Sequence, residues 1–236
     1  MMTELTLPII GYMHSSYKEK FGIPRQPNLV QVESYIEMLA PYNDVLAFEG
    51  IEAFSHLWLL WQFHDNKNPE KTQFRPQVRP PRLGGNKKIG VFATRSMYRP
   101  SPIGLSVVKL KCVKKEGRSV RVYVTGSDLL DGTPIVDIKP YIHYSDAVID
   151  AVSGYAQDEP NRKSVIWSDR AIKQKQQLLT SGKLSVQTAQ ELEAVLSLDP
   201  RPAYQDDEAR VYKMKFAAVD IAFTVGETTV NITAVE

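Results

Sequence analysis

The stretch LSVVKLKCVKKEGRSVRVYVT, residues 105–125, decides the fold class of this chain. Two runs rich in β-branched residues, 105–113 and 119–125, flank a polar segment that contains Gly117, and this arrangement predicts a β-hairpin. Other strand-like runs lie at residues 5–13, 45–54, 56–63, 88–94 and 134–141. Short strands at close spacing, without long helices between them, predict an antiparallel barrel or sandwich. Helical periodicity is weak in this part of the chain and is clearest at residues 29–38.

The last third of the chain has a different pattern. A polar helix is predicted at residues 168–180, and a second helix starts near Ser185 or Thr188 and ends before Pro200. Alternating apolar positions at 212–218, 221–225 and 229–234 predict strands. We therefore expect a mainly β protein, with an N-terminal domain at residues 1–150 and a smaller α+β C-terminal domain at residues 160–236.

Composition excludes several classes of protein. Of 236 residues, 43% are hydrophobic and the net charge is only +2, which excludes a disordered chain. The single cysteine, Cys112, cannot close an intrachain disulfide. We find no 18-residue apolar run and no basic leader followed by an apolar stretch, so we expect a cytoplasmic protein with no membrane segment.

Common catalytic motifs are also missing. No G-x-G-x-x-G follows a strand and no P-loop lysine motif is present, so a Rossmann cofactor site is not expected. His56 and His64 lie eight residues apart on one strand-like run. At about 3.3 Å per residue they are roughly 26 Å apart and cannot share a metal ion, so we expect no metal site.

Positive charge is concentrated in one segment. Residues 71–115 contain 12 lysines and arginines and no acidic residue, whereas the rest of the chain has 17 basic and 27 acidic residues. A basic segment on an otherwise acidic chain indicates a polyanionic partner.

Four loop-like clusters combine polar side chains with proline or glycine. A plain loop or turn remains an alternative for each, but together they offer rigid backbone, arginine forks and carboxylates, which are typical of a ligand site. The clusters are residues 21–27, residues 64–66, the long run 78–104 and residues 126–134.

Over about residues 8–145 the chain resembles the TsaA-like family. The resemblance rests on Phe54–Trp58, Val78–Gly85, Gly90–Ser96, Arg99–Gly104, Asp128–Pro134 and Asp137–Tyr141. A further segment, Leu198–Tyr204, is similar to the C-terminal domain of the bacterial members, which are tRNA N6-threonylcarbamoyladenosine methyltransferases.

The resemblance implies a β-barrel, non-Rossmann methyltransferase that uses S-adenosyl-L-methionine and works as a homodimer. By matching motif position, the implied cofactor-binding residues are Pro24, Arg25, Gln26, His64, Asp65, Arg95, Leu105, Asp128, Leu129 and Leu130. The implied substrate is a tRNA that carries threonylcarbamoyladenosine next to its anticodon, with methylation at N6. The residues that we expect to bind it are Arg79, Arg82, Arg99, Asp199, Arg201 and Tyr204.

The sequence identifies no catalytic base. Asp131 and Asp199 are both candidates for accepting the N6 proton, and nothing in the sequence selects between them. Two other functions stay open at this point. The first is a non-catalytic nucleic-acid-binding β-barrel module, which would need the arginines but no cofactor pocket. The second is a hydrolase that uses His64 and Asp128.

Overall fold

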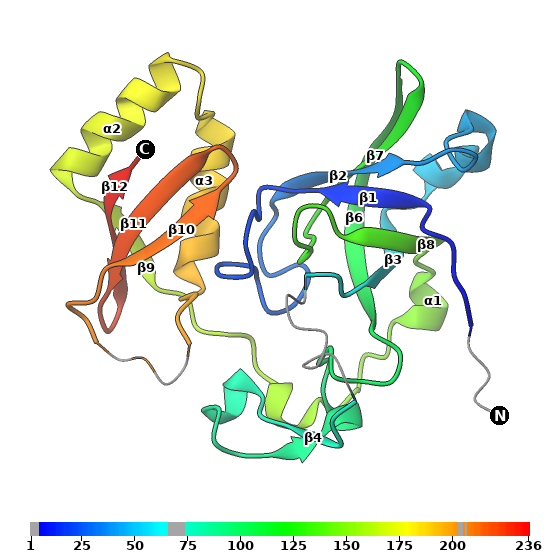
Figure 1. Ribbon diagram of the computed structural model, residues 1–236, viewed down its shortest axis with the longest axis horizontal. Coiled ribbons are helices and arrows are strands. Elements are labelled where there is room, and N and C mark those ends of the chain that lie inside the picture. The colour runs from blue at the N-terminus through cyan, green and yellow to red at the C-terminus, as the bar shows by residue number, and fades with distance from the viewer. Residues whose placement is uncertain (1–4, 66–73, 203–204, 206) are drawn as a thin grey trace.

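The first sheet is a closed barrel of six antiparallel strands (Figure 1). The computed structural model describes residues 5–65, 74–202, 205 and 207–236. Around the barrel the strands are β1 (Gly11–His14), β2 (Glu33–Met38), β7 (Ser119–Thr125), β6 (Ile103–Glu116), β3 (His56–Gln62) and β8 (Pro134–Pro140). The expected antiparallel barrel is therefore confirmed.

The β6–β7 hairpin forms where the sequence predicts it. Glu116 pairs with Ser119, and Gly117 has a φ of 63°, which a turn residue with a side chain adopts less readily. Along β7, and along β6 as far as Lys111, buried positions alternate with less buried ones, so one face of each strand enters the barrel core. That core is built from Met13, Ile36, Met38, Leu57, Leu59, Val108, Leu110, Val120, Val122, Val124, Leu129 and Ile135.

Several local expectations were wrong. Residues 45–54 form two short 3₁₀ turns, Val45–Phe48 and Ile51–Ala53, because the Asp44 side chain accepts a hydrogen bond from the Leu46 N–H and Gly50 takes a φ of 82°. Residues 29–38 contain strand β2 and no helix. In the run 5–13 only Gly11–Met13 of β1 are strand, and in the run 88–94 only β5 (Ile89–Gly90) is.

A second sheet lies in the C-terminal part of the chain. Its strand order is β10 (Tyr212–Phe216), β11 (Val219–Val225), β12 (Thr229–Val235) and β9 (Ser164–Trp167), with β9 parallel to β12. Helices α2 (Asp169–Thr180) and α3 (Val186–Ser197) pack against it. The helices start where predicted, since the hydroxyls of Ser168 and Ser185 accept hydrogen bonds from the Ala171 and Thr188 N–H groups.

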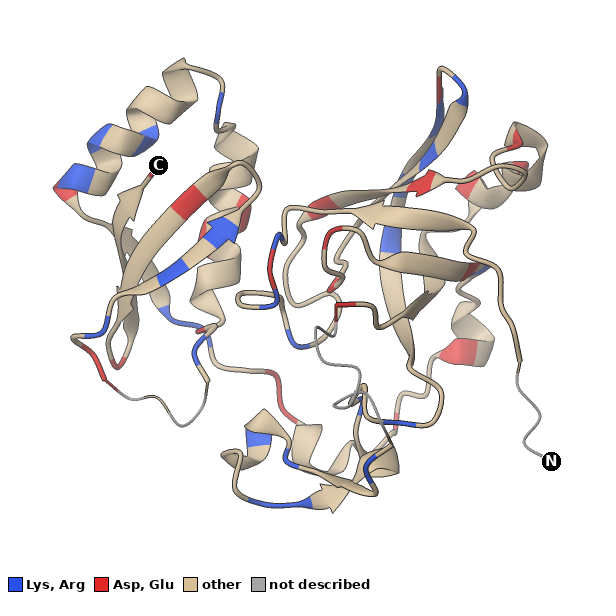
Figure 2. Cartoon of the chain, viewed as in Figure 1, with Lys and Arg blue, Asp and Glu red and all other residues tan. Residues whose placement is uncertain are grey.

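A small lobe is inserted between β3 and β6. It holds β5 and its partner β4 (Gln77–Val78). A short helix, α1 (His143–Asp146), lies between β8 and β9 in sequence. In Figure 2 the lysines and arginines of residues 75–99 lie on this lobe. No helix in the described part of the chain is long and apolar enough to span a membrane.

Candidate functional site

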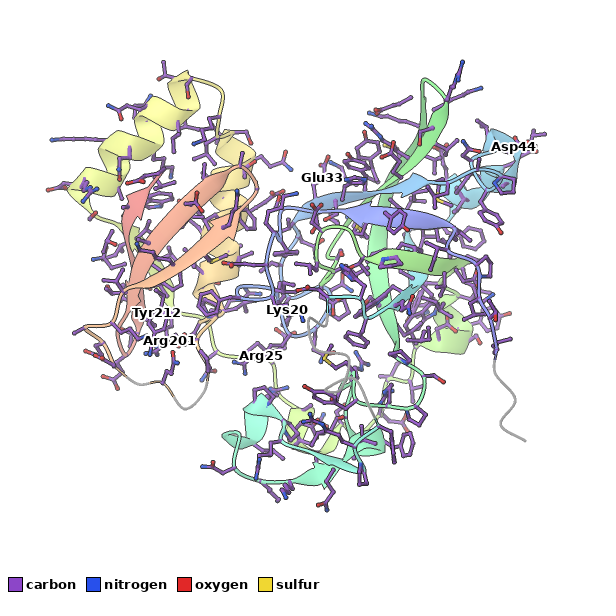
Figure 3. The ribbon with its side chains drawn as sticks, viewed as in Figure 1. Lys20, Arg25, Glu33, Asp44, Arg201 and Tyr212 are labelled. Atoms are coloured by element: carbon purple, nitrogen blue, oxygen red, sulfur yellow. The ribbon has the colours of Figure 1, made fainter. Side chains whose placement is uncertain are left out.

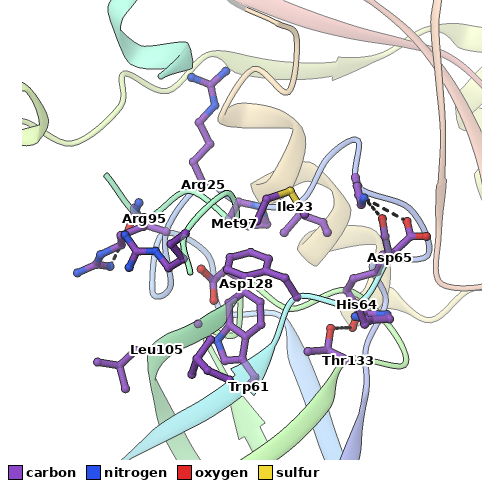
Figure 4. A pocket seen from close by; sticks show the side chains of 18 residues that line it. Ile23, Arg25, Trp61, His64, Asp65, Arg95, Met97, Leu105, Asp128 and Thr133 are labelled. Carbon is purple, nitrogen blue, oxygen red and sulfur yellow. Dashed lines mark hydrogen bonds and ion pairs between the residues drawn. The ribbon is translucent and has the colours of Figure 1, made fainter. Parts of the chain in front are cut away.

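A cavity of about 450 Å³ opens beside one end of the barrel (Figure 4). Four segments distant in sequence build it: the loop after β1, the end of β3, the segment that leads into β6, and the loop between β7 and β8. We call it the first cavity. Its lining is Lys20, Ile23, Pro24, Arg25, Gln26, Trp61, Phe63, His64, Asp65, Arg95, Met97, Arg99, Ile103, Gly104, Leu105, Asp128, Leu130 and Thr133.

The loop between β7 and β8 is held by its own polar side chains. The Ser127 hydroxyl accepts a hydrogen bond from the Leu129 N–H at 3.2 Å, and the Thr133 hydroxyl donates to the Leu130 carbonyl at 2.7 Å. Leu129 is only 1% exposed and anchors the loop in the barrel core. The loop therefore presents Asp128 to the cavity with little freedom to move.

Asp128 is linked to the apolar wall by a chain of hydrogen bonds. The Trp61 indole N–H donates to the Ser106 hydroxyl at 3.0 Å, and that hydroxyl donates to Oδ1 of Asp128 at 2.6 Å. Burial raises the pKa of the Asp128 carboxyl, and the hydrogen bond from Ser106 and the charge of Arg95 only partly oppose this effect. The cavity thus contains a carboxyl group whose loss of solvation is only partly offset by its fixed partners.

Replacing Asp128 by asparagine is expected to stabilise the folded protein at about pH 8 by roughly 1 kcal/mol. Because the folded-state pKa is raised, the folded protein binds this proton more tightly than the unfolded chain, so stability falls as the pH rises through the folded pKa. Asparagine keeps an Oδ1 acceptor for Ser106 and does not ionise, so the variant does not lose stability in this way as the pH rises. Urea unfolding of both proteins at about pH 8 and about pH 4 measures the gain in the free energy of unfolding. A gain of equal size at both pH values would contradict the account.

The wall formed by Trp61 and Phe63 is apolar. The rings of Trp61 and Phe63 meet edge to face with centroids 4.5 Å apart. Trp61 pairs across strands with Gly104, and a Cβ at Gly104 would lie 2.2 Å from the indole. Glycine is therefore needed here so that the indole can lie against the backbone of β6.

Positive charge surrounds the cavity. Arg95 donates from Nη1 to the Gln26 side-chain oxygen at 2.6 Å and so links two of the lining segments. Lys20 donates to the Asp65 carbonyl and lies 3.6 Å from its carboxylate. Arg99 donates to the carbonyls of Ser96 and Thr94 at 3.0 and 2.6 Å, which fixes the loop that carries Arg95.

A larger cavity of about 860 Å³, which we call the second cavity, adjoins the first. The two share Arg25, Gln26, Phe63, Arg95 and Met97. Lysines and arginines of the second cavity are Arg25, Arg75, Arg79, Arg82, Lys88 and Arg95, and its rim includes Asp158 and Glu159. The guanidinium of Arg75 lies over the Tyr98 ring, 4.2 Å from its centroid. An aromatic ring and several cations around one hollow are the features that bind an unpaired base and its phosphates.

The structure brings most of the expected cofactor residues together. Nine of the ten line the first cavity, and the tenth, Leu129, is buried behind it. Among the expected substrate residues, Arg79 and Arg82 line the second cavity, and Arg99 lines the first. Asp199 and Arg201 line a third cavity of about 440 Å³ on the other side of the loop after β1. Tyr204 lies outside the described residues, as does Asn66 of the second cluster.

Neither candidate base lies on the first cavity. Asp131 accepts from the Ser15 N–H and pairs with Lys18 at 2.8 Å, and Asp199 pairs with Arg201 at 2.8 Å. Eight lining residues were not named as site residues: Ile23, Met97, Ile103, Gly104 and Thr133, which lie within the loop-like clusters, and Lys20, Trp61 and Phe63, which lie outside them. The tryptophan-rich run before His64 was a usable signal for two of them, Trp61 and Phe63, because large aromatic side chains at a strand end are often half-exposed.

Comparisons with known proteins agree on one family. The tRNA-methyltransferase O N-terminal domain matches residues 12–147, and the TrmO C-terminal domain matches residues 160–236. A tRNA (adenine(37)-N6)-methyltransferase of Escherichia coli strain K12 is 45% identical over 208 residues, which cover 88% of this chain and 86% of that protein. A putative S-adenosylmethionine-dependent methyltransferase of Pseudomonas aeruginosa is 44% identical over 93% of this chain and 92% of its own. The crystal structure of TrmO from P. aeruginosa superposes with a TM-score of 0.78 at 35% identity and covers 100% of this chain and 99% of that one.

Proposed function

The chain belongs to the tRNA-methyltransferase O family and is an S-adenosylmethionine-dependent methyltransferase that acts on N6 of adenine 37 in tRNA, and from this premise we propose how its cavities divide the reaction. The first cavity holds S-adenosylmethionine, and the second receives the nucleotide to be methylated. One observation carries the proposal. The expected cofactor residues come from separate segments, yet they line one cavity that shares a wall with a hollow lined by six lysines and arginines.

The chemistry of the first cavity fits S-adenosylmethionine. The half-buried rings of Trp61 and Phe63 offer an apolar wall to the adenine ring. The Asp128 carboxylate can accept hydrogen bonds from ribose hydroxyls or from the ammonium group of the cofactor. Arg95 and Lys20 place positive charge where the cofactor carboxylate can reach it. A calorimetric titration is expected to show one S-adenosylmethionine site per chain, and no detectable heat or binding by any probe would contradict the assignment.

The residues of the chain then act by alignment. S-adenosylmethionine, when bound, supplies a methyl group on a sulfonium centre that is already a good leaving group. The enzyme has to hold N6 in line with that methyl group and to keep water out, which is a positioning task. Residues that line both cavities, among them Phe63, Met97 and Arg95, border the place where the two reactants meet and supply that alignment.

The proposed substrate is a tRNA whose adenine 37 carries the threonylcarbamoyl group. The guanidinium forks of Arg79 and Arg82 suit the phosphates beside that nucleotide better than lysines would. Arg99 is already bound to backbone carbonyls of its own loop, so its contribution is to hold that loop beside the substrate.

Affinity for tRNA is expected to fall steeply as salt concentration rises. Each phosphate contact made by a lysine or arginine contributes roughly 0.7–0.9 to the slope of log affinity against log salt. Replacing Arg79 and Arg82 together by alanine should lower that slope by about 1.5. Fluorescence anisotropy with labelled tRNA at several salt concentrations measures it. An unchanged slope in the double variant would remove both arginines from the RNA interface.

A homodimer in the cytoplasm, where the tRNA substrate is found, completes the proposal. It is supported by an exposed apolar segment after β8, in which Tyr144, Ile149 and Val152 are 91%, 94% and 90% exposed. Exposed apolar groups this close together are typical of a contact with another protein. Sedimentation velocity is expected to give a dimer, and replacing Ile149 and Val152 by serine should shift it toward monomer. A wild-type monomer at micromolar concentration would contradict the proposal.

A further inference from the structure

The loop between β1 and β2 leaves the barrel and becomes part of the C-terminal core. Tyr17 is 1% exposed and packs edge to face on Phe216, and Val30 and Val32 are buried in the same cluster as α3 and the second sheet. The backbone of this loop is also bound to the C-terminal part, because the Ala217 N–H donates to the Ser16 carbonyl at 2.8 Å. We call residues 15–32 the strap. Its position is therefore set by the C-terminal part as much as by the barrel.

Arg25 projects from the strap at the junction of the cavities. It lines the first, second and third cavities, and its Nη2 donates to the backbone carbonyl of Arg201 at 3.1 Å (Figure 3). A long exposed arginine side chain loses considerable rotamer freedom when it binds a ligand. A carbonyl that already orients the guanidinium reduces that loss, so Arg25 is partly pre-organised for an anion.

The carbonyl that holds Arg25 is itself fixed by an ion pair. Arg201 is 8% exposed, and its Nε and Nη2 donate to the two carboxylate oxygens of Asp199 at 2.9 and 2.8 Å. Its Nη1 donates to the Val225 carbonyl at 3.3 Å, and Lys163 lies 3.5 Å from Asp199. A bidentate pair of this kind fixes geometry as well as charge. Because the Arg201 guanidinium is buried and already donates to Asp199 and Val225, it is poorly placed to bind an RNA phosphate.

We propose that Asp199 and Arg201 form a positioning pair for Arg25, through which the C-terminal part of the chain sets the affinity of the first cavity for S-adenosylmethionine. The pair holds the Arg201 carbonyl, the carbonyl holds the Arg25 guanidinium, and the Arg25 residue lines both the first and the second cavity. This inference rests on the proposed cofactor cavity. It differs from the expectation that Asp199 and Arg201 contact the tRNA directly.

The test is a double-mutant cycle in the full-length protein. Arg201→Lys keeps the charge but loses the bidentate geometry, and we expect about a tenfold weaker S-adenosylmethionine affinity by calorimetry. Arg25→Ala should weaken affinity to a similar extent, and adding Arg201→Lys to it should change affinity less than about twofold, because the pair acts through Arg25. The rate of tRNA methylation at saturating S-adenosylmethionine is measured in parallel for each variant.

A matched control separates positioning from domain packing. Arg162 also joins the C-terminal part to the strap, since it donates to the Leu29 carbonyl, but it lines none of the three cavities. Arg162→Lys is expected to leave S-adenosylmethionine affinity within about twofold of wild type. Equal losses in Arg162→Lys and Arg201→Lys would overturn the inference. Should Arg201→Lys not fold, Asp199→Asn, which keeps one oxygen of the pair, takes its place.

Three further results would also overturn the inference, each in a different way. If Arg201→Lys lowers the methylation rate at saturating S-adenosylmethionine but leaves cofactor affinity unchanged, Arg201 serves the tRNA directly. If Arg25→Ala leaves cofactor affinity unchanged while Arg95→Ala weakens it, the cofactor cavity stands and the positioning role falls. If neither Arg25→Ala nor Arg95→Ala weakens affinity, the cavity assignment itself is wrong.

Discussion

Replacing Gly104 by alanine is expected to cost about 2 kcal/mol of folding free energy and most of the affinity for S-adenosylmethionine. An added Cβ would lie 2.2, 2.3 and 2.6 Å from three atoms of the Trp61 indole, so the ring would have to leave its place. The indole N–H would then lose Ser106, which in turn binds Asp128, and the apolar wall and the carboxylate of the first cavity would both shift. Urea unfolding and calorimetric titration measure the two effects.

Gly90 provides the matched control for this substitution. A Cβ at Gly90 would meet no heavy atom within 4 Å, and its φ of −59° is one that alanine adopts freely. Gly90→Ala should therefore change neither the folding free energy nor the affinity for S-adenosylmethionine measurably. A folded Gly104→Ala variant with wild-type affinity would show that the indole does not form the wall of the cofactor site.

The Arg95→Ala variant is expected to bind S-adenosylmethionine at least tenfold more weakly than wild type, a loss of about 1.4 kcal/mol. Arg95 is bound to Gln26 of the strap, lines the first and second cavities, and acts electrostatically on Asp128. The substitution removes a side chain that lines both cavities. It also removes the positive charge that lowers the pKa of the Asp128 carboxyl. Methylation of tRNA at low S-adenosylmethionine should fall by a similar factor.

Arg118→Ala serves as the control for loss of one positive charge, because Arg118 lies exposed at the tip of the β6–β7 hairpin. It should bind S-adenosylmethionine as wild type does. Unchanged affinity in a folded Arg95→Ala variant would remove Arg95 from the cofactor site, whatever the control shows.

The strands of the barrel were largely predictable because period-two alternation is a local property of the sequence. The hairpin at residues 105–125 shows this alternation in both of its strands. The run 45–54 is just as apolar, but the Asp44 side chain and Gly50 turn its backbone into 3₁₀ turns, and neither effect is a matter of apolar pattern. Local hydrogen bonding by a polar side chain outweighed strand propensity there.

The site was predictable as a set of loops but not as a shape. Loops rich in proline, glycine and arginine were found from composition, and most of them meet at the first cavity. The role of Gly104 depends on its cross-strand neighbour Trp61, which the sequence does not pair with it. Arg201 resembled an exposed substrate contact, yet Asp199 two residues earlier neutralises it and allows it to be buried. Pairings of this kind become visible only when the chain is folded.

The central claim is tested most directly by the nucleosides of tRNA after reaction. Purified protein is incubated with S-adenosylmethionine and a tRNA that carries threonylcarbamoyladenosine at position 37, and the digested nucleosides are analysed by mass spectrometry. The account predicts that threonylcarbamoyladenosine gains the mass of one methylene group with the wild-type protein, and at least about tenfold more slowly with Arg95→Ala at low S-adenosylmethionine. No mass gain with the folded wild-type protein, or a gain on a different nucleoside, would contradict it.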